Sequence, residues 1–180
     1  MKSFETAIKG GIKGTEEWKQ KKWEEKILRN NTYEAKYKKA FLQIFEAQQN
    51  DIIKEYTATK SVKKLPKWNS LKYLTMYFSL LSKTQEELFV AEANEALRLA
   101  NLNSFFVIGN TLKTGFLRSN IQRMAKDIDK VTKDEIFSLI TQGENSGFGV
   151  DKIVTSIKDK FTQYKTSRVE AIVRTETISA

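Results

Sequence analysis

Apolar positions recur at helical spacing along most of the chain. In the N-terminal third one face is formed by Tyr37, Phe41, Phe45, Gln48, Ile52 and Tyr56, with Ile44 beside it. Residues that return every three or four positions share one side of an α-helix. The spacing predicts a long amphipathic helix that ends before Pro66. A first helix is expected from about Thr15 to Arg29, weakly interrupted at Asn30 to Thr32.

Beyond Pro66 the apolar pattern predicts several further helices. Residues 71–81 are dense enough in leucine, methionine and phenylalanine for a buried helix. Thr84 with Glu87 has the form of a capping box, which predicts a new helix with its apolar face in residues 89–100. A turn near residues 101–103 follows, and Phe105 to Gly109 is the one segment with the character of a short strand. We expect no sheet from a single strand.

The C-terminal third continues the helical pattern. Ile121, Met124, Ile128 and Val131 mark one helix, and Thr132 with Glu135 predicts the start of another through a second capping box. That helix is expected to stop at Gln142–Gly143. The stripe Val150, Ile153, Ile157 and Phe161 predicts a last amphipathic helix before residue 167. The prediction is an all-α fold with two parts, a basic N-terminal helical arm over residues 1–66 and a compact helical core over residues 67–180.

Composition supports helices and excludes several chemistries. One proline and eight glycines in 180 residues leave few breaks. Cysteine and histidine are both absent, which excludes disulfides, thiol nucleophiles, Cys/His zinc sites and Ser-His-Asp triads. Carboxylate pairs and Ser/Lys arrangements remain possible, but no motif in the sequence supports them, so we expect no enzyme, no catalytic residues, no cofactor and no metal site. The apolar stretches fall far short of the roughly 20 residues that cross a bilayer. We expect a soluble chain that is made in a cytoplasm and has no membrane anchor.

Charge is concentrated in the N-terminal part. Residues 1–70 carry 16 basic and 9 acidic side chains, whereas residues 71–180 carry 15 and 13, within a total of +9. Such an asymmetry suggests a polyanionic partner, either nucleic acid or an acidic protein surface, and a solvated helix face is the alternative. The candidate DNA or partner contacts are Lys19, Lys21, Lys22, Lys36, Lys38, Lys39, Lys63, Lys64 and Lys67. Trp18, Trp23, Tyr33 and Tyr37 lie among them, available for stacking on bases or for packing against a partner.

The last helical segment carries a specific motif. It reads Ser167-Arg-Val-Glu-Ala-Ile-Val-Arg-Thr-Glu-Thr177, in which Ser167 can cap a helix and Glu170 precedes Arg174 by one turn. This segment resembles the hallmark R-A-x-x-I-A-R-T-E-T of the phage head morphogenesis family of minor head proteins, of the phage Mu F type. The matching residues are Arg168, Ile172, Arg174, Thr175, Glu176 and Thr177. Val169 and Val173 stand where the family commonly has alanine.

The likeness extends back to Val131 and includes the glycines at 143, 147 and 149. It implies a minor capsid protein of a tailed bacteriophage, inside the virion head near the portal vertex. Its implied partners are the portal protein and the major capsid or scaffold proteins, with double-stranded DNA as a further partner during packaging or ejection. The alternative is a free-standing basic helical nucleic-acid-binding protein. An enzyme or toxin is a third class, for which the chain shows no catalytic set.

The motif's charged residues have two interpretations. In the structural one, Arg168, Arg174 and Glu176 form salt bridges that lock the last helix to the core, with Glu170 as the partner of a buried Arg174. In the functional one, they contact DNA or another subunit. The structural interpretation is the one we expect, because an acid lies beside the bases in this motif.

Overall fold

The computed structural model describes residues 14–59, 65–109 and 111–178. Helices make up most of these residues and no strand occurs among them, which confirms the all-α prediction. The α-helices are α2 (Glu16–Thr59), α3 (Ser70–Leu99), α4 (Arg118–Asn145), α5 (Val150–Gln163) and α6 (Val169–Ile178). Two π-helical segments, η1 (Leu112–Leu117) and η2 (Tyr164–Arg168), lead into α4 and α6.

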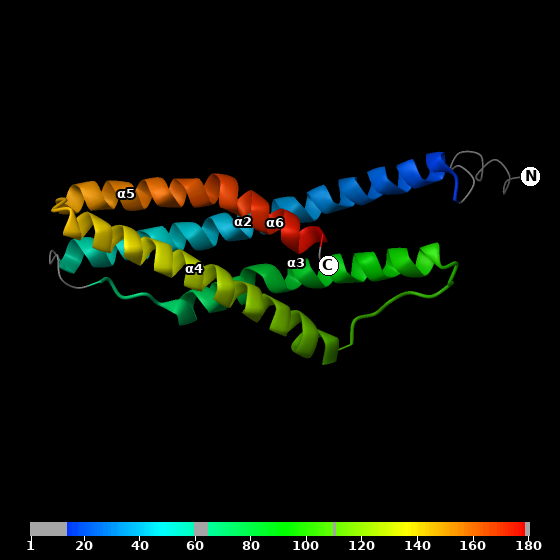
Figure 1. The fold of residues 1–180 in the computed structure, drawn as a ribbon. Coiled ribbons are helices and arrows are strands. Elements are labelled where there is room, and N and C mark those ends of the chain that lie inside the picture. Colours follow the sequence, from blue (N-terminus) through cyan, green and yellow to red (C-terminus); the bar gives the residue numbers. More distant parts are fainter. Residues whose placement is uncertain (1–13, 60–64, 110, 179–180) are drawn as a thin grey trace, which may run out of the picture.

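Four helices form an elongated up-and-down bundle. α2 runs the length of the molecule, α3 returns beside it, and α4 and α5 repeat the reversal across the other side (Figure 1). α2 packs on α3 and α5, and α4 packs on the same two helices from the opposite side. Packing of this kind buries one apolar stripe from each helix in a shared core. α6 extends the line of α5 and packs on α2.

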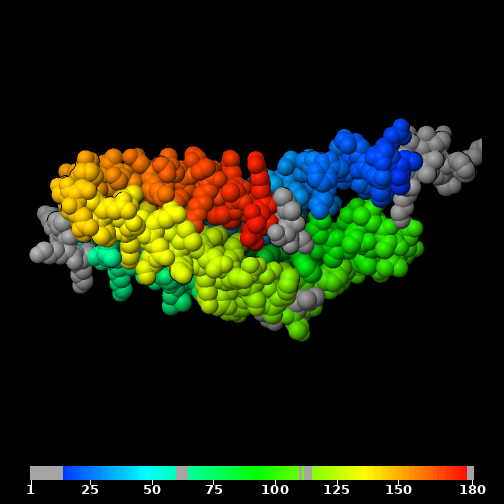
Figure 2. All heavy atoms as spheres, in the orientation of Figure 1, coloured from blue at the N-terminus to red at the C-terminus, as the bar shows by residue number. Residues whose placement is uncertain are grey.

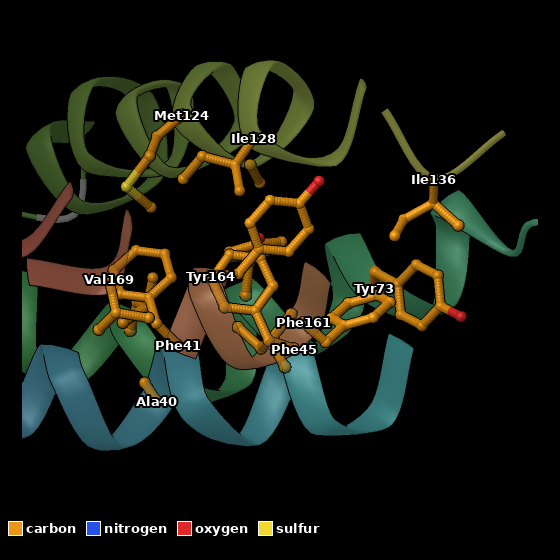
Figure 3. Close-up of a cluster of buried hydrophobic side chains, with 14 of the residues drawn as sticks. Ala40, Phe41, Phe45, Tyr73, Met124, Ile128, Ile136, Phe161, Tyr164 and Val169 are labelled. Atoms are coloured by element: carbon orange, nitrogen blue, oxygen red, sulfur yellow. The ribbon is translucent and has the colours of Figure 1, made fainter. Parts of the chain in front are cut away.

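The core is rich in aromatic side chains. Phe41 and Phe45 of α2 meet Phe161 and Tyr164 from the C-terminal helices (Figure 3). Rings of Phe45 and Tyr164 lie 5.6 Å apart between centroids, and those of Phe161 and Tyr164 lie 5.5 Å apart at a near-perpendicular angle. Edge-to-face contacts of this kind add to the free energy of burial. The predicted α2 stripe is confirmed, since all of its members are buried.

The division at Pro66 does not separate an arm from the core. Residues 37–56 of α2 lie in the same cluster of buried side chains as residues of α3, α4, α5 and α6. Only the first part of α2, before Tyr37, has no buried residue. Within the expected arm, the second part of α2 therefore belongs to the core. A continuous helix of 44 residues is long enough both to enter the bundle and to extend beyond it.

Three expected helix boundaries are absent. α2 runs unbroken through Asn30 to Thr32, and α3 and α4 run unbroken through Thr84 and Thr132. Both threonines are buried in mid-helix, and the Thr132 hydroxyl donates a 2.7 Å hydrogen bond to the carbonyl of Ile128. A threonine that bonds back to the preceding turn needs no helix end, so the capping-box interpretation was wrong at both places. Ser167 likewise lies within helix and donates to the Gln163 carbonyl.

α3 ends at the predicted turn, whereas α4 ends at Asn145, two residues beyond the predicted stop at Gln142–Gly143. At the end of α4 the amide of Phe148 donates to the carbonyl of Gly143 at 2.9 Å, and Gly147 has a φ of +71°. At the end of α3 the amide of Leu102 donates to Leu97 in the same way, and Asn101 has a φ of +58°. Glycine and asparagine are the residues that best adopt this left-handed conformation. Both reversals of the bundle are thus encoded locally.

An extended segment joins α3 to α4. Residues 102–109 belong to no helix and no strand, as expected for a lone strand-like sequence. The Phe106 amide donates to the Asn94 side chain at 2.7 Å, which ties the segment to α3. None of the helices in the described part of the chain combines the length and hydropathy of a membrane span.

Candidate functional site

The motif segment occupies the end of one continuous helical rod. α5, η2 and α6 follow one another without a break, so the motif begins in π-helix and ends in α-helix. A π-helical turn inserts an extra residue into the helix and is often found at functional sites. α5, before this segment, packs on both α2 and α4, whereas α6, after it, packs mainly on α2.

Arg168 is the motif residue that joins two helices. Its Nη1 atom donates a 3.1 Å hydrogen bond to the hydroxyl of Thr132 on α4. Its guanidinium lies over the ring of Tyr164, 4.9 Å from the centroid. A planar cation can stack on an aromatic face and donate in its own plane at the same time. Arg168 therefore has the structural role that we expected, although through a hydroxyl and a ring and not through a carboxylate.

A carboxylate lies close to this contact. The Tyr164 hydroxyl donates to Oε2 of Glu135 at 2.6 Å, and Lys160 Nζ lies 2.9 Å from the same oxygen. Burial acts to raise the pKa of Glu135, but the hydrogen bonds from Tyr164 and Lys160 outweigh it, so the pKa is lowered. Burial and the bond to Glu135 raise the pKa of the Tyr164 hydroxyl. Glu135 thus stays ionised and binds α4 to the rod.

One face of α6 is buried against α2. Val169 and Val173 are in the core and Ile172 packs against it. Thr177 is buried too, and its hydroxyl lies 3.0 Å from the Val173 carbonyl and 3.4 Å from a Glu34 carboxylate oxygen on α2. The motif's apolar positions are therefore packing positions, as the periodicity predicted.

The other face of α6 is open. Arg174 and Thr175 are exposed, and the Arg174 side chain has no ion pair or hydrogen bond with the residues that the structure describes. Glu170 is 3.3 Å from Lys38 of α2 instead of pairing with Arg174. The expected buried Glu170–Arg174 pair was wrong, because position 174 follows the buried Val173 by about 100° around the helix. A surface groove beside Arg174 is lined by Asn31, Glu34, Ala35, Lys38, Glu170 and Val173.

Glu176 has an unfavourable position for a carboxylate. It is half-buried, and burial raises its pKa, while the charge of Arg123 on α4 acts in the opposite direction. No ion pair within 4 Å satisfies this carboxylate among the described residues. The pocket around it includes Gln85 and Phe89 of α3, Phe116 of η1 and Thr175. We expected a salt bridge from Glu176 to a neighbouring helix. Among the described residues the interaction is instead a longer-range attraction to Arg123 of α4.

The sequence patterns missed a buried polar cluster in the bundle. Asp129 of α4 is 8 % exposed, and its Oδ1 accepts from Gln48 Nε2 of α2 at 3.1 Å and from Trp68 Nε1 at 2.9 Å. The aspartate breaks no periodicity, so nothing in the pattern distinguishes it from a surface acid. A polar residue inside the α2 stripe at Gln48 was the available signal, because a buried amide needs a partner.

The candidate lysines do not form one surface. Lys36 pairs with Glu87 of α3 at 2.5 Å, whereas Lys38 pairs with Glu170 of α6, so the two point to different neighbours. Lys19 pairs with Glu16 at 2.6 Å, and Lys22 pairs with Glu25. Lys21, Lys39 and Lys67 are exposed, and Lys63 and Lys64 lie outside the described residues. The structure therefore brings together no continuous strip of free cations along α2.

The charge of α2 supports this finding. The helix holds nine basic and eight acidic side chains, a net of +1. The basic excess of the first 70 residues therefore lies elsewhere, with +2 in residues 1–13 and +4 in residues 60–67. A helix with a cation excess of only one charge is expected to release few counterions from DNA and to offer little affinity for it.

Groups of acidic side chains that could hold a metal ion are absent from the part of the chain that the structure describes. Comparison of the chain with protein-family models, with curated proteins and with solved structures found no match. The assignment of function therefore depends on the motif and on the surfaces described above.

Proposed function

We propose that this chain is a minor head protein of a tailed bacteriophage, which docks on the portal or the inner capsid and assists head assembly. The resemblance of residues 131–180 to the phage head morphogenesis family carries the proposal. The all-helical bundle is the fold class that the periodicity of the sequence predicted. Its proposed place is the interior of the head near the portal vertex, and no catalysis is part of the proposal.

The open face of α6 supports docking to a protein. Arg174 and Thr175 belong to the motif, yet they lie on the surface and have no role in the core. An exposed arginine without a partner among the described residues, on a groove that Lys38 and Glu170 also line, offers donors to a carboxylate or a carbonyl of another subunit. A structural explanation covers the buried motif residues but not this pair.

The same surfaces favour a protein partner over DNA at α2. Lysines 19, 22, 36 and 38 are engaged in ion pairs within the chain. DNA contact, as in the alternative of a free-standing nucleic-acid-binding protein, would depend on residues 1–13 and 60–67, which hold the excess of positive charge.

The experiment is capture of the portal protein encoded nearest to this chain, after co-expression of the two proteins. We expect recovery with the wild-type chain and with Lys158→Glu, an exposed charge change on α5, but a large loss with Arg174→Glu. Unchanged circular dichroism would show that each variant is folded. No recovery of portal with the wild-type chain would overturn the proposal, and recovery of nucleic acid in its place would favour the alternative.

A further inference from the structure

Among the residues that the structure describes, one end of the molecule consists of α2, α3 and the extended segment that follows α3. We call the distal end residues 16–30 of α2, residues 89–99 of α3 and the extended segment 102–109. These parts project beyond α4 and α6 (Figures 1 and 2). Neither helix has a buried residue within these bounds, whereas both have many inside the bundle. The two helices therefore lack here the two covering helices that they have elsewhere.

Apolar side chains gather at this end. Ten large hydrophobic side chains are exposed among the described residues, and six belong to the distal end. The most exposed are Phe105 at 90 %, Val107 at 83 % and Leu28 at 71 %, and the other three are Trp23, Ile27 and Leu102. Scattered exposed hydrophobic residues are normal, but a concentration on one end indicates an interaction surface.

Three of these six side chains, Trp23, Leu102 and Phe105, border two open grooves. One lies between the helices, with Trp18 and Trp23 on the α2 side and Ala96 and Leu99 on the α3 side. The other lies between α3 and the extended segment, lined by Ala91, Leu102 and Phe105. Arg29 and Glu95 border both grooves, so the two form adjoining parts of one surface.

The charges of the distal end are balanced. It contains six basic and six acidic side chains, although the whole chain carries +9. Arg29 pairs with Glu92 at 2.9 Å, and Arg98 pairs with Glu95 at 2.6 Å. A surface without net charge offers little to nucleic acid or to a strongly charged partner. It is also the place where two copies of a basic chain can meet without bringing like charges together.

We propose that the distal end is a self-association surface, at which two copies of this chain pack their α2–α3 hairpins into an intermolecular four-helix bundle. The other end of the same chain shows the kind of packing that we propose, because there α2 and α3 are covered by two further helices, α4 and α5. A second hairpin, related by a two-fold axis, supplies two such helices. This inference is independent of the proposed role in the phage head.

The test is the mass of the full chain by sedimentation equilibrium. The wild type is expected to reach about twice its 20.8 kDa in a concentration-dependent way. The double variant Leu28→Glu/Phe105→Glu is expected to weaken association by about a hundredfold, because each lost apolar contact occurs twice in a two-fold interface. Both side chains are exposed in the monomer, so its circular dichroism should not change.

Leu71→Glu is the matched control, since Leu71 is 74 % exposed but lies at the start of α3, away from the distal end. It should leave the association constant unchanged. Val107→Lys provides a second distal variant outside any helix, and it should also weaken association. A wild-type chain that stays monomeric well above micromolar concentration would overturn the inference. So would a dimer that persists in both distal variants or that is lost in Leu71→Glu.

Discussion

The guanidinium of Arg168 donates a 3.1 Å hydrogen bond to the hydroxyl of Thr132, and this contact connects the motif to α4. The same hydroxyl donates to Ile128, so it bonds as donor and acceptor at once. Its acceptor role requires an arginine at this position of the π-helical segment. The contact also explains why Thr132 is a buried residue and not a cap.

Arg168→Ala is expected to lower the free energy of unfolding by about 1.5 kcal/mol, the lower end of the range for a hydrogen bond to a charged group, because the side chain is half-buried. Arg174→Ala is the control and should change it by less than about 0.5 kcal/mol, as for other exposed residues without partners. Urea denaturation measures both values. An equal loss in the two variants would contradict the assigned roles.

Glu135→Gln tests the contact between α4 and the rod through pH. The pKa of Glu135 is lowered in the folded chain, so its contribution is present above the ordinary value of 4.5 and is lost as pH falls through the folded pKa. The wild type should be the more stable protein near pH 7, and the difference should shrink toward pH 3. Thermal unfolding across this range measures it. A difference that does not depend on pH would exclude the ionic role.

Glu176→Gln should have the opposite effect. Burial raises the pKa of Glu176, so the folded chain holds its proton more tightly than the unfolded chain. The contribution of this group to stability is then present at low pH and lost as pH rises through the folded pKa. The variant is expected to be more stable than the wild type near neutral pH and equal to it in acid. A variant that is less stable at neutral pH would show that Glu176 has a favourable partner.

Gly143→Ala should destabilise the reversal between α4 and α5. A Cβ atom at this position would lie 2.8 Å from Cγ1 of the buried Ile153, so either this side chain or one of the two helices must move. The expected loss is about 1–3 kcal/mol, as for other overpacked cores. Gly149→Ala is the control, because a Cβ there meets nothing within 4 Å and φ is −67°. Equal melting temperatures for the two variants would show that the fold accommodates the added methyl group at residue 143 without a loss of stability, and would contradict this prediction.

Periodicity predicted the helices and much of the core, but it failed where local signals compete with packing. It assigned the α2 stripe correctly and overlooked Tyr73 and Tyr77, which are fully buried in α3, while Leu71 is exposed. In residues 71–81 the expected core consists of the many leucine, methionine and phenylalanine side chains and leaves out the two tyrosines, each with a large apolar ring and a polar hydroxyl. Pairs that join distant elements, such as Trp68 with Asp129, leave no trace in local spacing.

The exposure of Arg174 shows a second limit. An acid one turn before a base predicts an ion pair on an isolated helix. In the folded chain Glu170 has Lys38 as a neighbour from α2, and the local partner is not used. The motif was thus recognisable from the sequence, but the division of its residues between core and surface depended on which face α6 presents to α2.

The number of residues in the π-helical segment η2 determines which face of α6 packs on α2. Buried positions advance by three or four residues from Ile153 through Ile157 and Phe161 to Tyr164, then by five to Val169, and by four again to Val173. Removing one residue at the exposed Thr166 or Ser167 would turn α6 by about 100° and carry its valines away from α2. The chain should therefore accept many residue types in this segment but only one length, so that a single codon lost here does more harm than most substitutions in the core.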